Sequence, residues 1–127
     1  AIEGRTIGET LELAVKAGSS ETSKVLTKAL QAETSVRELS KEFGLHCDLG
    51  AGVPSLMYNL KKATSFTEAV RANLYAGGDN CGRAIILGAV CGAQFGMGGD
   101  AGIPEAWLRQ IRGIEQLELS VDELLGF

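Results

Sequence analysis

The sequence predicts an all-α fold, an orthogonal multi-helix bundle arranged around a central glycine-rich apolar helix. Apolar residues recur at the three- and four-residue spacing of amphipathic helices, and no segment sustains the two-residue alternation of a strand. Capping boxes also recur, with a Ser or Thr hydroxyl followed three residues later by Glu. The four boxes are Thr6/Glu9, Ser35/Glu38, Ser65/Glu68 and Ser120/Glu123.

Length and composition favour one globular domain over residues 1–127. The chain has 127 residues, 45% of them hydrophobic and 22% charged, which suffices for a single core. The formal net charge is −4 and no basic cluster is present, so we expect no nucleic-acid partner. The longest apolar run, residues 84–93, is too short to span a bilayer, so we expect no membrane partner.

The cysteines and the first residues of the chain bear on the cellular compartment and on where the natural protein sequence begins. Cys47, Cys81 and Cys91 are an odd number without C-x-x-C spacing, so we expect reduced thiols in a cytoplasmic protein. The first residues contain no apolar run of a signal peptide. Residues 2–5, Ile-Glu-Gly-Arg, match a protease recognition sequence used to remove expression tags. They are either the remnant of such a tag or a coincidental match, so we base no functional inference on residues 1–5.

Three helices are expected in the first third of the chain. The first begins after Thr6 and ends at Gly18, because glycine commonly follows the last helical turn. The second covers Ser20–Gln31. The third begins after Ser35 and ends at Gly44.

The middle of the chain predicts a loop and two more helices. Residues 46–52 are glycine-rich and are expected to form the loop. Pro54 is expected to begin the next helix, residues 54–62, since proline lacks an amide that would be unpaired there anyway. A further helix over Phe66–Ala76 ends at two glycines, residues 77–78.

The next helix, capped by Asp79 or Asn80 and running to about Phe95, is expected to be the centre of the core. Residues 84–93 are apolar on every side of the helix. Glycine costs about 1 kcal/mol in a helix, so a glycine ridge predicts that another helix packs closely there. The ridge consists of Gly88, Gly92 and Gly96.

The last part of the chain predicts a flexible loop followed by two helices. The loop is residues 98–102, which contain three glycines. Pro104 opens a helix that ends at Gly113, and a last helix follows Ser120.

The turn before the glycine-ridged helix is the strongest candidate for a functional site. Asp79 would lie at a helix N-terminus, where free amides and the helix dipole keep a carboxylate ionised. It could bind a metal ion or a sugar or phosphate group, or it could simply cap the helix. The candidate ligand-binding residues around it are Gly77, Gly78, Asn80, Cys81 and Gly82.

These residues carry a family resemblance. The segment GGDNCGRAIILGAVCGAQFG at 77–96, the following IPEAW and the preceding VPSLMYNLKKATSFTEAVRANLYA resemble the C-terminal signature of the ADP-ribosylglycohydrolase superfamily. The resemblance covers about residues 35–116. It implies a compact all-α protein that binds two magnesium ions and ADP-ribose or an ADP-ribosylated substrate. The implied reaction hydrolyses the bond between ADP-ribose and its acceptor.

The chain departs from the family pattern at two positions. Catalytic members read Gly-Gly-Asp-x-Asp-Thr, which implies Asp79 as a magnesium ligand here, but Cys81 and Gly82 replace the second Asp and the Thr. Magnesium prefers oxygen ligands, so we expect no magnesium bound to this chain. The adjacent aspartates of the family's N-terminal half are also absent. The resemblance thus implies the C-terminal portion of a larger all-α domain, inactive as this portion alone.

A second interpretation is a non-catalytic relative. The Asn80-Cys81 variant resembles J-type crystallins, so the chain could be a structural or ligand-binding protein that self-associates, and enzymatic activity stays open. Exposed apolar surface would then favour a homodimer. Cys81 is also a candidate reactive thiol, because a helix N-terminus and nearby Arg83 would lower its pKa, or else it is a small residue in place of an aspartate.

Overall fold

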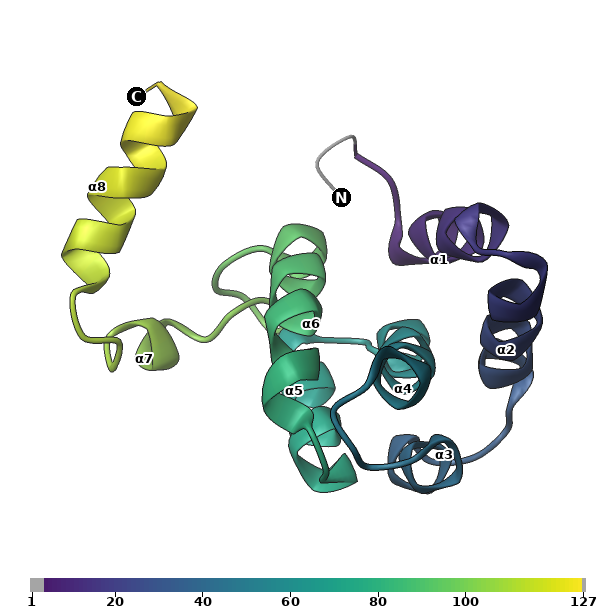
Figure 1. Cartoon of the computed structure of the whole chain (residues 1–127). Coiled ribbons are helices and arrows are strands. Elements are labelled where there is room, and N and C mark those ends of the chain that lie inside the picture. The colour runs from purple at the N-terminus through teal and green to yellow at the C-terminus, as the bar shows by residue number, and fades with distance from the viewer. Residues whose placement is uncertain (1–3, 127) are drawn as a thin grey trace.

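The computed structural model describes residues 4–126, so the first residues of the tag-like segment lie outside the described part (Figure 1). The all-α prediction is confirmed, because the described residues contain helices and no β-strand. The helices are α1 (Ile7–Ala17), α2 (Ser20–Gln31), α3 (Val36–Phe43), α4 (Leu49–Lys62), α5 (Phe66–Ala76), α6 (Asn80–Phe95), α7 (Glu105–Leu108) and α8 (Ile114–Leu125).

Two of the expected capping boxes form completely, at the starts of α1 and α3. At α3 the Ser35 hydroxyl accepts the Glu38 amide at 3.1 Å, and the Glu38 carboxylate accepts the Ser35 amide at 3.2 Å. Hydrogen bonds from the hydroxyls of Thr34 and Ser35 lower the pKa of Glu38. Thr6 and Glu9 make the same reciprocal pair at α1.

The other two boxes differ from the prediction. At α5 the Ser65 hydroxyl accepts the Glu68 amide, but the Glu68 carboxylate accepts from Thr64. The box at Ser120 is wrong, since Ser120 lies inside α8 and donates to the Gln116 carbonyl.

Helix α4 begins earlier than predicted, at Leu49. Asp48 is its N-cap and accepts the Ala51 amide at 2.9 Å, so residues 49–52 are helical and the predicted loop is shorter. Pro54 therefore lies inside the helix. Its missing amide leaves only the Gly50 carbonyl without a helical donor, which the helix tolerates near its start.

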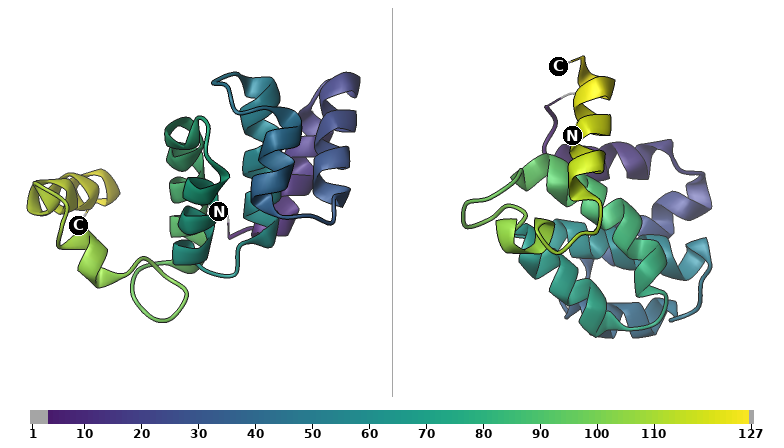
Figure 2. Two further views of the ribbon diagram at one scale, coloured as in Figure 1. Left: turned by 90° about the horizontal axis from the view of Figure 1, so that it is seen from below. Right: turned by 90° about the vertical axis from the view of Figure 1, so that its left-hand side faces the viewer.

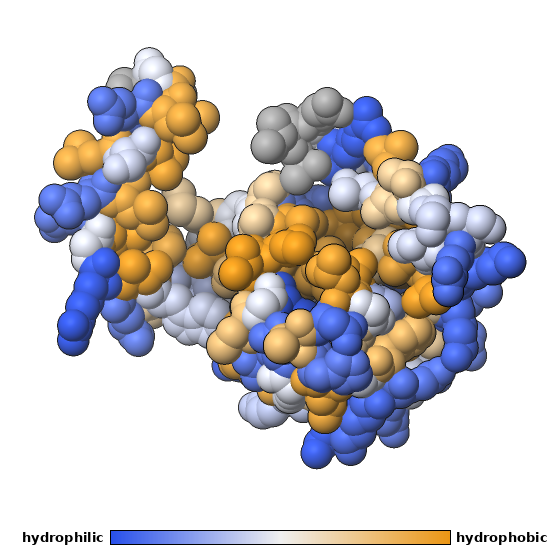
Figure 3. Space-filling view, in the orientation of Figure 1, coloured by the Kyte–Doolittle hydropathy of each residue, from blue (hydrophilic) through white to orange (hydrophobic). Residues whose placement is uncertain are grey.

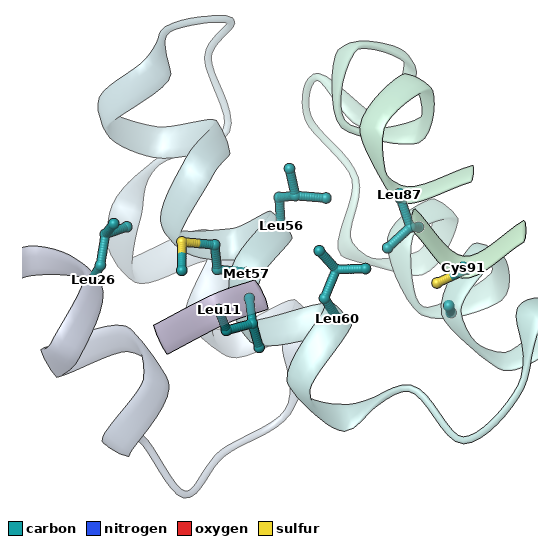
Figure 4. Packing of buried hydrophobic residues seen from close by; sticks show 8 residues of the cluster. Leu11, Leu26, Leu56, Met57, Leu60, Leu87 and Cys91 are labelled. Carbon is teal, nitrogen blue, oxygen red and sulfur yellow. The ribbon is translucent and has the colours of Figure 1, made fainter. Parts of the chain in front are cut away.

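The centre of the core is α4, which corrects the expectation for the glycine-ridged helix. All residues of α4 from 54 to 60 are buried, and α4 packs against α1, α2, α3, α5 and α6. Figure 4 shows Leu56, Met57 and Leu60 of α4 between residues of the surrounding helices. The surrounding residues are Leu11 of α1, Leu26 of α2, and Leu87 and Cys91 of α6.

Helix α6 buries one face only. Arg83, Leu87 and Cys91 point inward, whereas Ile85 is 76% exposed and Ile86 is 52% exposed. The expected close helix on the glycine ridge is absent from residues 4–126. A Cβ atom added at Gly88 or Gly96 would meet nothing within 4 Å, and one at Gly92 would meet only Ile103 at 3.6 Å. Because residues 84–93 are apolar around the whole helix, hydropathy alone could not predict which face of α6 is covered.

The C-terminal segment also differs from the prediction. Helix α7 ends at Leu108 and not at Gly113, and α8 begins at Ile114 instead of after Ser120. The Trp107 ring packs edge-on against Phe66 at 6.3 Å, which ties α7 to the body. Helix α8 extends away from α1–α5 (Figures 1 and 2). Within the described residues, no helix is both long and apolar enough to cross a bilayer.

Candidate functional site

A pocket of about 420 Å³ lies between the N-terminal ends of α4 and α6. This volume is within the range of small-molecule sites, about 300–1,000 Å³. The segments that form it are the start of α4 with its preceding turn and the first two turns of α6. The lining residues are Cys47, Asp48, Leu49, Gly52, Val53, Leu56, Asp79, Gly82, Arg83 and Ile86.

Contact between two distant turns brings these helix ends together. The Asp79 amide donates to the Leu45 carbonyl at 3.1 Å. Gly78, with φ +63°, lies so close that an added Cβ would be 2.5 Å from the Leu45 carbonyl oxygen and 2.8 Å from its Cα. Glycine is therefore required at position 78 both by backbone conformation and by space.

Asp79 is the N-cap of α6, as one of the two sequence interpretations predicted. Its carboxylate accepts the Gly82 amide at 3.2 Å. A Cβ at position 82 would collide with that carboxylate. The glycine at 82 thus leaves room for Asp79 to fold back onto its own helix while it lines the pocket.

Asp48 is a second capping carboxylate in the same pocket, and its role as a helix cap was not predicted from the sequence. It caps α4, and its Oδ2 lies 2.6 Å from His46 Nε2. The signal was available, because an Asp in front of a possible helical turn is a common N-cap. Pro54 gives a competing start signal six residues later.

A buried polar network holds the turn before α6. The Arg83 Nε donates to Asn73 Oδ1 at 2.9 Å, and its Nη2 donates to the Gly77 carbonyl at 2.5 Å. Asn73 Nδ2 in turn donates to the Asn80 carbonyl at 2.8 Å. Burial lowers the pKa of Arg83, and the negative charge of Asp79 partly offsets this effect. An arginine side chain stays protonated in spite of such a decrease. The network therefore fixes the charged side chain of Arg83, which is one of the residues that line the pocket.

The candidate residues from the sequence are only partly brought together. Asp79 and Gly82 line the pocket, whereas Gly77 and Gly78 in the adjoining turn and Asn80 at the start of α6 do not line it. Cys81 is exposed outside the pocket lining, with its Sγ 3.5 Å from Asn80 Oδ1. Arg83 was expected to lower the pKa of Cys81, but its guanidinium is hydrogen-bonded to Asn73 and Gly77.

The donors of this pocket do not fit the two magnesium ions that the resemblance implies. Among residues 4–126, no three His, Cys, Asp or Glu side chains gather where they could hold a metal ion. Asp48 and Asp79 each already accept a backbone amide as helix caps. Magnesium needs several convergent oxygen ligands, so the described residues do not make a two-metal centre.

The three thiols should differ in reactivity according to burial. Cys47 and Cys81 are exposed, whereas Cys91 is buried, and burial raises the pKa of Cys91 to about 11. We expect brief iodoacetamide treatment of the folded chain at pH 8 to modify Cys47 and Cys81 but not Cys91. Peptide mass spectrometry measures the three sites, and a denatured sample is the control. Labelling of Cys91 at the rate of the other two would contradict the packing of α6.

Comparison of the sequence with known protein families gives a match. A family model described as ADP-ribosylglycohydrolase matches residues 1–126. No curated protein and no solved structure matches the chain significantly.

Proposed function

Because the chain belongs to the ADP-ribosylglycohydrolase family, we propose that it is the ligand-binding C-terminal portion of a protein that hydrolyses an ADP-ribosyl N- or O-glycosidic bond. The observation that carries the proposal is the pocket between α4 and α6, with Asp48 and Asp79 at its two helix ends. ADP-ribose, or the ADP-ribosyl group of a modified substrate, is the proposed ligand.

The chemistry of the pocket supports such a ligand. Ionised carboxylates accept hydrogen bonds, so Asp48 and Asp79 can receive those of ribose hydroxyls. Arg83 supplies a positive charge in the lining of the pocket, which suits a phosphate group. Apolar side chains cover the remaining wall and can contact the flat faces of the ligand. They are Leu49, Val53, Leu56 and Ile86.

We expect binding without hydrolysis by the described residues alone. Water attack on the ribose needs a group that activates the water, and in the proposed complex the carboxylates of Asp48 and Asp79 already accept hydrogen bonds from helix amides and from the ribose hydroxyls. Acidic residues from another segment would have to complete the reaction centre.

A non-catalytic relative, similar in role to a crystallin, is the second candidate. The feature that favours it is Gly82, which lets Asp79 act as a helix cap where catalytic relatives carry a threonine. The two candidates share ligand binding and differ in whether any longer form of the protein releases ADP-ribose.

Filling the pocket tests the proposal without disturbing the fold. An added Cβ at Gly52 meets nothing within 4 Å, and the residue lies within α4. Gly52→Leu should therefore keep or raise thermal stability, since leucine is favoured over glycine in helices by up to about 1 kcal/mol. The new side chain would occupy the ligand's space. We expect calorimetric titration to show ADP-ribose binding to the native chain and at least about tenfold weaker binding to Gly52→Leu.

The matched control is Gly8→Leu. Gly8 is an exposed helical glycine of α1 that does not line the pocket, so this variant should bind ADP-ribose as the native chain does. Equal binding by Gly52→Leu and Gly8→Leu would place the ligand elsewhere. A native chain that does not bind ADP-ribose would refute the proposed function.

A further inference from the structure

The chain exposes more surface than a compact monomer of its mass. Its accessible surface is 8398 Å² at 13.3 kDa. The scaling law for folded monomers gives about 6,500 Å² at this mass, so the excess is roughly 1,900 Å². A standard protein–protein interface buries about 1,600 Å² in total. The excess is therefore large enough for a stable interface.

One source of this surface is an apolar stripe on α8. The stripe has the spacing of alternating three and four residues that characterises a packed helix. Leu117 is 53% exposed, Val121 44% and Leu124 85%. The α8 stripe is Ile114, Leu117, Val121, Leu124 and Leu125. Figure 3 shows hydrophobic side chains along this helix and over the middle of the body.

The second source is the open face of α6. It consists of Ile85, Ile86, Gly88, Ala89 and Gly92, on the side opposite the buried Leu87 and Cys91. The side chains of both isoleucines are more than half exposed. At Gly88 an added Cβ would meet nothing within 4 Å, so a helix from outside could approach the backbone there.

The charges of the two helices favour pairing of α8 with α6 over pairing of α8 with α8. Helix α8 carries four acidic residues and no basic one, so pairing two α8 helices would bring like charges together. Residues 84–95 of α6 contain no charged side chain. An α8 helix can therefore pack on the open face of α6 without repulsion.

The connection between α7 and α8 favours contact with another molecule. The Gln110 amide donates to the Trp107 carbonyl at 3.1 Å, and the Ile111 amide donates to the Leu108 carbonyl at 3.0 Å. These turns follow α7, which the Trp107–Phe66 contact ties to the body, and they direct α8 away from its own α6 (Figure 2).

We propose that a second copy of this chain covers both surfaces by exchange of arms. The α8 stripe of each copy packs on the open face of α6 of the other, which gives a two-fold symmetric dimer with two equal contacts. The test of this pairing does not require ADP-ribose binding, and the pairing surfaces and the pocket share only Ile86, which belongs to the open face of α6 and also lines the pocket.

Single charge insertions test each surface. We expect sedimentation equilibrium to show a dimer for the native chain. Val121→Asp on the stripe and Ile85→Asp on the open face should each weaken dimerisation by about a hundredfold, because each buries an unpaired charge in the contact. Leu119→Asp is the matched control, since Leu119 is 68% exposed on the opposite side of α8 and should leave the dimer intact. Circular dichroism checks that every variant remains helical.

Mixing the two weakened variants is the decisive arm. A mixture of Val121→Asp and Ile85→Asp should form heterodimers, because the α8 of the Ile85→Asp copy still fits the α6 of the Val121→Asp copy. Pairing of α8 with α8 would leave Ile85→Asp dimeric by itself, which would overturn the proposal. A native chain that is monomeric would overturn it too. That result is expected if α8 folds back onto its own α6 or if another protein covers these faces. The absence of heterodimers in the mixture would also overturn the proposal.

Discussion

Arg83→Met should lower the free energy of unfolding by about 2–4 kcal/mol, which is large for one substitution. Arg83 is only 5% exposed, and its guanidinium bonds the side chain of Asn73 and the carbonyl of Gly77. Methionine fills a similar volume but donates no hydrogen bond. The variant leaves both acceptors without their donor, in a region where water reaches them poorly.

Urea unfolding followed by circular dichroism measures this effect. Arg71→Met is the matched control, because Arg71 is exposed on α5 and its loss should change stability by less than about 0.5 kcal/mol. The double variant with Asn73→Leu should be less destabilised than the sum of the single variants, because it removes both partners of one bond. Equal effects of Arg83→Met and Arg71→Met would show that the network does not stabilise the fold.

Gly78→Ala should destabilise the chain by about 2–4 kcal/mol and weaken ligand binding as well. The residue has φ +63°, a conformation that costs a non-glycine residue about 1 kcal/mol or more. The new Cβ would also press on the backbone of Leu45, which cannot rotate away as a side chain could. Separation of these two turns would move Asp79 away from Asp48.

Gly113→Ala separates the two causes. Gly113 has φ +73° but nothing lies within 4 Å of an added Cβ, so only the conformational cost applies. Thermal unfolding of both variants should show the larger decrease for Gly78→Ala. Decreases of the same size would mean that the approach of the two turns contributes little.

Local signals in the sequence predicted most helix boundaries. Ser35 and Glu38 satisfy each other's backbone groups within one turn, so no distant contact is needed to place the start of α3. The start of α4 was missed because two local signals compete there. Pro54 suits a first helical position, but Asp48 already caps a turn six residues earlier.

Tertiary contacts explain what the sequence could not predict. Asp79 was found through its motif, but its neighbour Asp48 lies 31 positions earlier, and the Gly78–Leu45 contact joins the two turns. The burial of α6 was misjudged for a related reason. Hydropathy shows that Ile85 and Leu87 are both apolar, whereas the packing of α4 and α5 against one side of α6 decides that Leu87 is buried.

Amide NMR spectra of the chain during titration with ADP-ribose test the central claim most directly. The account predicts that the largest shift changes fall at residues 47–53 and 79–86, the two helix ends that line the pocket. It also predicts that Gly52→Leu loses these changes while Gly8→Leu keeps them. Shift changes confined to α1 and α2, or none at saturating ligand, would contradict an ADP-ribose site between α4 and α6.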